Sequence, residues 1–190
     1  MTGTLPEPFA GWFARQGWAP RPHQLAVLAA AQAGRDVLLV APTGGGKTLA
    51  GFLPSLTELA ATSPAGLHTL YVSPLKALAA DVGRNLIRPV CELSLNITIA
   101  TRSGDTTATE RRKQRENPPN ILLTTPESLA VLLSQSGIST LFAPVRRIVI
   151  DEIHALAGSK RGDQLAGRAL RKPAFLLVVG AEECDPLASD

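Results

Sequence analysis

A glycine-rich segment, Ala41-Pro42-Thr43-Gly44-Gly45-Gly46-Lys47-Thr48, has the residue types that bind phosphate. Glycines let a backbone turn so tightly that several N–H groups can point at one anion. The ammonium group of Lys47 suits the β- and γ-phosphates of a nucleotide, and the hydroxyl of Thr48 suits Mg²⁺. Ala41 stands where the strictest form of this motif has glycine. The segment predicts a phosphate loop whose contacts come from Thr43, Gly44, Gly45, Gly46, Lys47 and Thr48.

A second chemical motif, Asp151-Glu152-Ile153-His154, follows the apolar run 148–150. A carboxylate at the tip of a strand beside a phosphate loop can bind Mg²⁺, and we expect Asp151 to do so. Glu152 is placed to orient and deprotonate an attacking water, mainly through position and electrostatics. His154 has no task in phosphoryl transfer, and we expect it to relay the nucleotide state to neighbouring elements.

Short apolar runs alternate with helical patterns along the chain. The strands are expected at 37–40, 69–72, 97–100, 121–123 and 148–150, with a weaker one at 175–179. The helices are expected at 22–33, 47–60, 75–91, 107–114, 126–134 and 164–170. The runs are rich in leucine and β-branched residues, as strands buried on both faces are. This alternation predicts an α/β fold with a doubly wound, mostly parallel sheet.

Two strand ends share a pattern in which a hydroxyl residue and a proline open a helix. Val72 is followed by Ser73-Pro74, and Leu123 by Thr124-Thr125-Pro126. Ser73 and Thr125 are natural N-caps, and proline is favoured at the first helical position. Free N–H groups at such helix starts suit phosphate, and several along one edge of the sheet would suit a nucleic-acid backbone. The pattern fits well-capped helices without a ligand equally well.

Three other segments have a plain structural interpretation from residue chemistry alone. Gln24 has an amide that matches the two-faced edge of adenine, but a surface glutamine is the simpler prediction. The aromatic cluster of Phe9, Trp12, Phe13 and Trp18 is most simply a packed cap against the sheet. The basic run 111–115 is most simply a solvated helix face with pairing to Glu110 and Glu116.

Composition narrows the class of protein. The chain has 190 residues, 45% of them hydrophobic and 18% charged, which is typical of a folded globular protein. No apolar run approaches the ~20 residues that span a bilayer, and the start lacks a signal-peptide pattern, so we expect a cytoplasmic protein without a membrane contact. Cys91 and Cys184 show no metal-type spacing. The net charge of +3 permits nucleic-acid binding without arguing for it.

Taken together, the motifs resemble those of superfamily 2 helicases, in order and spacing, from Trp12 to about Leu165. The resemblance implies a RecA-like P-loop domain that binds ATP and Mg²⁺, with Gln24 on the adenine. It also implies contacts to the backbone of a single DNA strand. The residues that match the family's DNA-contacting motifs are Ser73, Pro74, Lys76, Arg102, Gly104, Asp105, Thr124, Thr125 and Pro126.

The wording of four segments is similar to the large helicase-related (Lhr) family: 20–24, 70–78, 122–129 and 159–165. The opening residues 5–13 are similar to the ligase-associated DNA damage response helicases of bacteria. The resemblance implies an ATP-driven 3′→5′ DNA translocase in repair, with DNA-repair ligase partners.

One departure limits this expectation. The family has a Ser-Ala-Thr motif soon after the Lys-Arg-Gly segment, whereas the chain has Ala181-Glu182-Glu183-Cys184 there. The second RecA-like lobe, with its arginine fingers, is missing from the chain, so we expect slow ATP hydrolysis or none. We expect three parts: N-terminal helices with Gln24 (1–34), a RecA-like ATP-binding lobe (35–180) and a divergent tail (181–190).

Two alternatives remain. The chain could be a non-catalytic module that binds nucleotide or DNA, which ATPase assays with and without single-stranded DNA would reveal. It could also be a P-loop enzyme of another class, such as a small-molecule kinase. Salt-sensitive binding to single-stranded DNA would argue against that enzyme, because phosphate contacts weaken steeply with salt.

Overall fold

Six parallel strands form the centre of the fold. The computed structural model describes residues 4–41, 45–73, 82, 86–151 and 175–180. The strands are β1 (Val37–Val40), β2 (Thr69–Val72), β3 (Ile99–Arg102), β4 (Ile121–Thr124), β5 (Arg147–Asp151) and β6 (Phe175–Gly180). Their order in the sheet is β1-β6-β5-β2-β4-β3, and every neighbouring pair is parallel. The predicted parallel α/β sheet is therefore confirmed, including its weakest strand, β6.

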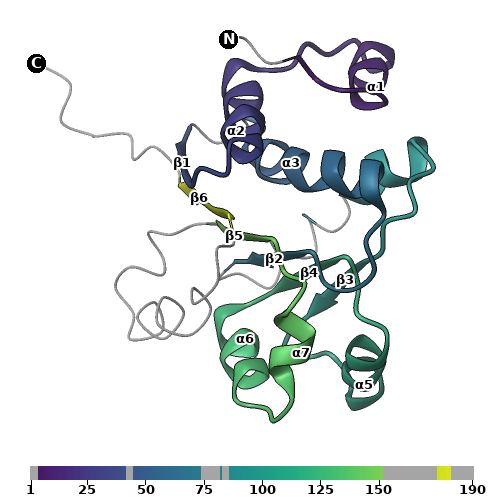
Figure 1. Ribbon diagram of the computed structural model, residues 1–190, viewed down its shortest axis with the longest axis vertical. Coiled ribbons are helices and arrows are strands. Elements are labelled where there is room, and N and C mark those ends of the chain that lie inside the picture. Colours follow the sequence, from purple (N-terminus) through teal and green to yellow (C-terminus); the bar gives the residue numbers. More distant parts are fainter. Residues whose placement is uncertain (1–3, 42–44, 74–81, 83–85, 152–174, 181–190) are drawn as a thin grey trace, which may run out of the picture.

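Helices cover both faces of the sheet (Figure 1). On one side lie α1 (Phe9–Arg15), α2 (Pro22–Gln32) and the long α3 (Lys47–Thr62). On the other lie α5 (Ala108–Glu116), α6 (Pro126–Leu133) and α7 (Ile138–Phe142). Residues 86–92 are also helical. Among the described residues, no helix is long and apolar enough to cross a membrane.

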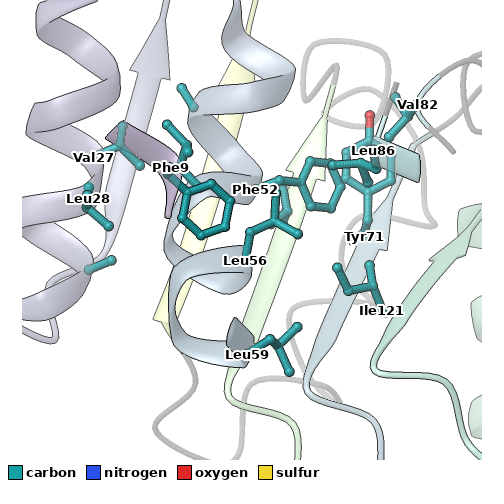
Figure 2. Close-up of a cluster of buried hydrophobic side chains, with 14 of the residues drawn as sticks. Phe9, Val27, Leu28, Phe52, Leu56, Leu59, Tyr71, Val82, Leu86 and Ile121 are labelled. Atoms are coloured by element: carbon teal, nitrogen blue, oxygen red, sulfur yellow. The ribbon is translucent and has the colours of Figure 1, made fainter. Parts of the chain in front are cut away.

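The core has two parts because side chains alternate along each strand. Tyr71 and Ile121 point to the α3 side, where they join a cluster with Phe9, Phe52 and Leu56 (Figure 2). Leu123 belongs to the same cluster. The intervening strand residues, Leu70, Val72, Leu122 and Ile148, point to the other side and pack on α6 and α7. Strands β2 and β4 thus pack on α3 with one face and on α6 with the other.

Some boundaries differ from the sequence expectation. The strand expected at 97–100 is β3 at Ile99–Arg102, because Ile97 is held in a turn by its N–H bond to the Leu95 carbonyl. The expectation that every strand is buried on both faces is wrong for β1, where Leu38 and Val40 are exposed. Helix α7 was not predicted, since five residues after Gly137 carry too little periodicity. The expected helices at 75–91 and 164–170 lie partly and wholly outside the described residues.

A polar network lies at the amino ends of the strands, opposite the predicted ligand edge. Glu58 of α3 forms an ion pair with the buried Arg147, and its pKa is lowered. Burial alone would raise that pKa, but the hydrogen bonds and charges of Arg147 and, to a lesser extent, His68 together outweigh it. His68 is buried beside both groups, with Nδ1 2.8 Å from the Thr69 hydroxyl. Burial lowers the pKa of His68. The charge of Glu58 raises it, and the charge of Arg147 lowers it by less than Glu58 raises it.

Stability is therefore expected to fall as the pH drops below the ordinary His pKa of about 6.5. A lowered folded-state pKa means that the unfolded chain takes up a proton first, so protonation of His68 favours unfolding. Urea unfolding followed by circular dichroism between pH 8 and pH 5 measures this loss. His68→Gln should flatten the slope between pH 7 and pH 5, and an unchanged slope would assign the loss to other groups.

Candidate functional site

The glycine-rich loop ends at the start of α3, as its sequence predicted. Gly46 is the N-cap of α3 and has φ 73°, a left-handed conformation that favours glycine. No side chain caps this helix, so its first N–H groups remain available for an anion. Lys47 Nζ donates to the Ala41 carbonyl at 2.6 Å, which places the ammonium across the mouth of the loop. Thr43 and Gly44 lie outside the described residues.

Gln24 lies against this loop. Its amide nitrogen donates to the Gly46 carbonyl at 3.4 Å, and its amide oxygen accepts from the Arg21 N–H at 2.9 Å. A Cβ added at Gly46 would meet that amide nitrogen at 3.0 Å, so glycine also allows the close approach. Gln24 is 4% exposed. The prediction of a surface glutamine, made from residue chemistry alone, is therefore wrong, because tertiary packing of α2 against α3 buries it.

A pocket of about 490 Å³ opens beside Gln24. It is lined by Phe13, Gly17, Trp18, Ala19, Arg21, Gln24, Gly46 and Leu49. The predicted aromatic cap is confirmed for Phe9, Trp12 and Phe13, which are buried in the core. Trp18 differs because 46% of its surface is exposed, and it forms part of the pocket wall. The pocket therefore joins an aromatic ring, a guanidinium group and a buried amide to the phosphate loop.

Asp151 ends β5 and is 7% exposed. Its Oδ2 accepts a hydrogen bond from the Tyr71 hydroxyl at 2.5 Å. A buried tyrosine needs a partner for its hydroxyl, and here that partner fixes the carboxylate at the end of the strand. Within the described ranges, no three His, Cys, Asp or Glu side chains gather as a metal cluster. Glu152 and His154 lie outside the described residues.

The hydroxyl residues at the carboxyl ends of β2 and β4 are buried. Thr124 Oγ1 donates to the Arg102 carbonyl at 2.9 Å and ties β4 to β3. Thr125 is the N-cap of α6, as predicted, and accepts from the Ser128 N–H at 3.4 Å, with Pro126 at the first helical position. Ser73 is fully buried, and its hydroxyl has no hydrogen-bond partner among the residues that the structure describes. Pro74 and Lys76 lie outside the described residues.

Arg102, at the end of β3, is a buried cation. It is 3% exposed, and within the described residues its side chain forms one hydrogen bond, a long one of 3.5 Å to Gln114. Burial lowers its pKa, and the positive charges of Arg111 and Arg115 lower it further. Among the described residues, no carboxylate raises the pKa of Arg102 against these effects. The end of β3 is thus a place where an added anion would be favourable.

The basic run on α5 is only partly the solvated face that was predicted. Arg112 pairs with Glu116 on the surface, at 3.7 Å, as expected. Arg111 instead turns inward, and its Nη2 donates to the Gly104 carbonyl at 3.0 Å. Glu110 accepts from the Thr107 N–H in a capping box, so it stabilises the start of the helix.

Sequence reasoning missed Trp18, Arg21 and Tyr71 as parts of this site. Trp18 and Arg21 lie between α1 and α2 in sequence, and only the fold brings them to the pocket beside Gly46. A tyrosine such as Tyr71 is typical of a buried strand, and only its hydroxyl group indicated that it needs a hydrogen-bond partner. That partner, Asp151, is 80 residues away in sequence.

The parallel sheet, the loop at the start of α3 and the carboxylate at the end of β5 define a RecA-like nucleotide-binding domain. The chain matches the DEAD/DEAH box helicase family over residues 21–179. It therefore belongs to that family.

Its relatives are Lhr-type helicases. The chain is 45% identical over 168 residues to an Lhr helicase/probable uracil glycosylase of Mycolicibacterium smegmatis, covering 82% of this chain and 11% of the relative. It is 38% identical to an ATP-dependent helicase Lhr-Core protein 2 of Thermococcus barophilus, covering 85% of this chain and 20% of the relative. The chain thus spans about a fifth or less of these relatives.

Solved helicase structures are also similar to the chain. The helicase Lhr of Mycobacterium smegmatis, bound to single-stranded DNA and AMP-PNP, matches 93% of this chain and 24% of its own, with a TM-score of 0.84 and 39% identity. The DUF1998 helicase MrfA, bound to DNA and AMPPNP, matches 98% of this chain and 27% of its own, with a TM-score of 0.82 and 28% identity.

Proposed function

We propose that this chain is the ATP-binding motor lobe of an ATP-dependent DNA helicase that acts in DNA repair. The observation that carries the proposal is that a pocket lies directly beside the phosphate loop at the start of α3. Gln24 and Trp18 border a pocket, and Lys47 with the free N–H groups of α3 borders the phosphate loop. A nucleotide needs such an arrangement, with a pocket for its base and sugar next to a loop that binds its phosphates.

The residues have the chemistry that ATP and Mg²⁺ require. The Gln24 amide has a donor and an acceptor for the edge of adenine, and the ring of Trp18 offers a face for stacking. Thr48 and Asp151 supply the oxygen ligands that Mg²⁺ prefers, with phosphate oxygens and water completing the shell. When bound, Mg²⁺ neutralises charge that develops on the phosphates. Glu152 is proposed to orient water, and His154 to relay the nucleotide state.

Nucleic acid is proposed to run along the carboxyl edge of β2, β4 and β3. The hydroxyls of Thr124 and Thr125 are already used within the protein, which leaves backbone groups at these turns for a phosphate backbone. Ser73, Pro74, Lys76, Gly104, Asp105 and Pro126 belong to the same proposed contact set. Arg102 adds a buried positive charge, and the Lhr structure bound to single-stranded DNA makes a single strand the first ligand to test.

The decisive experiment measures ATP hydrolysis by the chain with and without single-stranded DNA. Turnover that single-stranded DNA stimulates, even slow turnover, would exclude the second candidate, a non-catalytic nucleotide- and DNA-binding module. Binding of nucleotide or DNA without turnover supports that second candidate. The missing Ser-Ala-Thr motif after Asp151 favours that second candidate. If neither ATP nor DNA binds, both proposals fail. A 3′→5′ direction, a second lobe and ligase partners are further proposals for the full-length protein.

Arg102→Met is expected to weaken DNA binding without lowering the stability of the fold. Removing a buried cation that has no carboxylate partner in the described part of the chain should leave the free energy of unfolding unchanged or raise it. Affinity for single-stranded DNA should fall at least about tenfold, since a hydrogen bond to a charged group contributes about 1.5–3 kcal/mol. Urea unfolding and fluorescence anisotropy measure the two quantities.

The salt dependence of binding provides a further check. Loss of one phosphate contact should reduce the slope of log affinity against log salt by about 0.7. Arg112→Met is the matched control, because that arginine lies on α5 with its side chain 69% exposed. Equal effects of the two substitutions on DNA binding would contradict a specific role for Arg102.

A further inference from the structure

Two charged residues of the helical segment 86–92 bind the N-terminal helix α1. Arg88 and Glu92 are four residues apart, and Arg88 Nε donates to Glu92 Oε1 at 2.7 Å. The other carboxylate oxygen, Oε2, accepts from Trp12 Nε1 at 2.6 Å and from Gln16 Nε2 at 2.9 Å. Both oxygens of Glu92 are therefore used, and α1 is fixed to a segment more than 70 residues later in the sequence.

Arg88 also reaches the residue that borders the pocket. Its Nη2 donates to Gln16 Oε1 at 2.5 Å, and its Cζ lies 5.9 Å from the centroid of the Trp18 ring. That distance lies within the range of a cation–π contact. Two edge-on aromatic contacts complete the surroundings of Trp18, with Trp12 at 5.5 Å and Phe13 at 6.1 Å. Arg88 thus contacts both Gln16 and the indole ring.

Trp18 needs such support because the rest of its surroundings are open. It is 46% exposed and follows Gly17, which has φ 69° and lies beyond the end of α1. A half-exposed side chain on a turn has several rotamers of similar energy. If only a fraction of molecules hold the ring as a pocket wall, the apparent dissociation constant for a ligand that stacks on it rises by the inverse of that fraction.

We propose that Arg88 and Glu92 are positioning residues for recognition of the nucleobase, because they hold Trp18 as a wall of the pocket beside Gln24. The proposal rests on the proposed nucleotide function of that pocket. Under this proposal, Arg88 and Glu92 strengthen binding of the base of a nucleoside triphosphate and have no effect on binding of its phosphates. The phosphate contacts come from Gly46 and Lys47, which share no hydrogen bond with this cluster.

A purely structural role makes a different prediction. An exposed ion pair that only fastens α1 would change stability slightly and leave the preference for a base unchanged. The chain offers a matched pair for comparison: Arg112 and Glu116 on α5 have the same four-residue spacing and exposed side chains, with no aromatic ring against them in the described part of the chain. Arg88 and Glu92 are 53% and 37% exposed, and the α5 pair is 69% and 63% exposed.

The test compares ATP with inorganic tripolyphosphate, both with Mg²⁺, by calorimetry on the full chain. Arg88→Ala is expected to weaken ATP binding about two- to fivefold, the range of an exposed cation–π contact, and to leave tripolyphosphate binding unchanged. Arg112→Ala should change neither. Arg88→Lys, which keeps a cation for the ring, should retain part of the ATP affinity. Circular dichroism checks that each variant is folded.

Tryptophan fluorescence gives an independent measurement, because the only two tryptophans, Trp12 and Trp18, both lie in this cluster. The change in emission on adding ATP should be smaller in Arg88→Ala than in the original chain. Equal weakening of ATP and tripolyphosphate, or no weakening of either, would overturn the positioning role while leaving nucleotide binding intact. If the unaltered chain binds tripolyphosphate no more weakly than ATP, base recognition itself fails, and the proposal fails with it.

Discussion

Replacing Lys47 with alanine is expected to lower the affinity for Mg-ATP by about one to two orders of magnitude. A hydrogen bond to a charged group contributes about 1.5–3 kcal/mol, which corresponds to roughly a 10- to 150-fold change in the dissociation constant. In the structure Lys47 Nζ is held by the Ala41 carbonyl at 2.6 Å, so the ammonium already lies at the loop. Binding a nucleotide exchanges one carbonyl for phosphate oxygens with far more negative charge. Calorimetry with ATP measures the loss.

A control must separate this local effect from the loss of one positive charge. Lys113 lies on the exposed surface of α5, and Lys113→Ala changes the net charge equally. That variant should bind ATP as the original chain does. Lys47→Ala should also keep its melting temperature, because the hydrogen bond that it loses lies at a helix start, where water replaces it. Equal ATP affinity in Lys47→Ala and the original chain would end the assignment of the phosphate loop.

The parts of the fold that the sequence predicted well depend on local pattern. Short apolar runs marked β1, β2, β4 and β5 to within a residue, because buried parallel strands leave few polar positions. The start of α3 followed from Gly46-Lys47, since glycine and a helix start are both local features. The shift of β3 has a different origin. The apolar pattern begins at Ile97 because that side chain is buried, whereas the strand itself begins two residues later, at Ile99.

The site divides in the same way. The phosphate loop and Asp151 could be predicted because each is defined by a few adjacent residues. The burial of Gln24 could not be predicted from its residue type, since it depends on packing of α2 against α3. The link between Tyr71 and Asp151, and that between Arg88 and Trp18, join residues 70 or more positions apart. One sequence without a fold contains no signal for such pairs.

Phe52→Ala is expected to reduce the free energy of unfolding by about 3–5 kcal/mol, the usual cost of emptying a buried aromatic site. Phe52 is fully buried in α3, and its ring centroid lies 5.1 Å from that of Tyr71 (Figure 2). Total stabilities of about 5–15 kcal/mol make this a large fraction. Urea unfolding followed by circular dichroism gives the value. Val131→Ala, at a position 54% exposed on α6, should change it by less than about 0.5 kcal/mol.

The same substitution should also affect the nucleotide site, because Phe52 packs against the ring of Tyr71, whose hydroxyl donates a hydrogen bond to Asp151. We expect Phe52→Ala to weaken the dependence of ATP binding on Mg²⁺, even at temperatures where the variant is fully folded. Tyr71→Phe separates the two causes, since it keeps the ring in the core and removes only the hydrogen bond. If Tyr71→Phe reproduces the change in Mg²⁺ dependence with a much smaller loss of stability, the hydroxyl positions the carboxylate. If only Phe52→Ala produces the change, core packing positions the end of β5 directly.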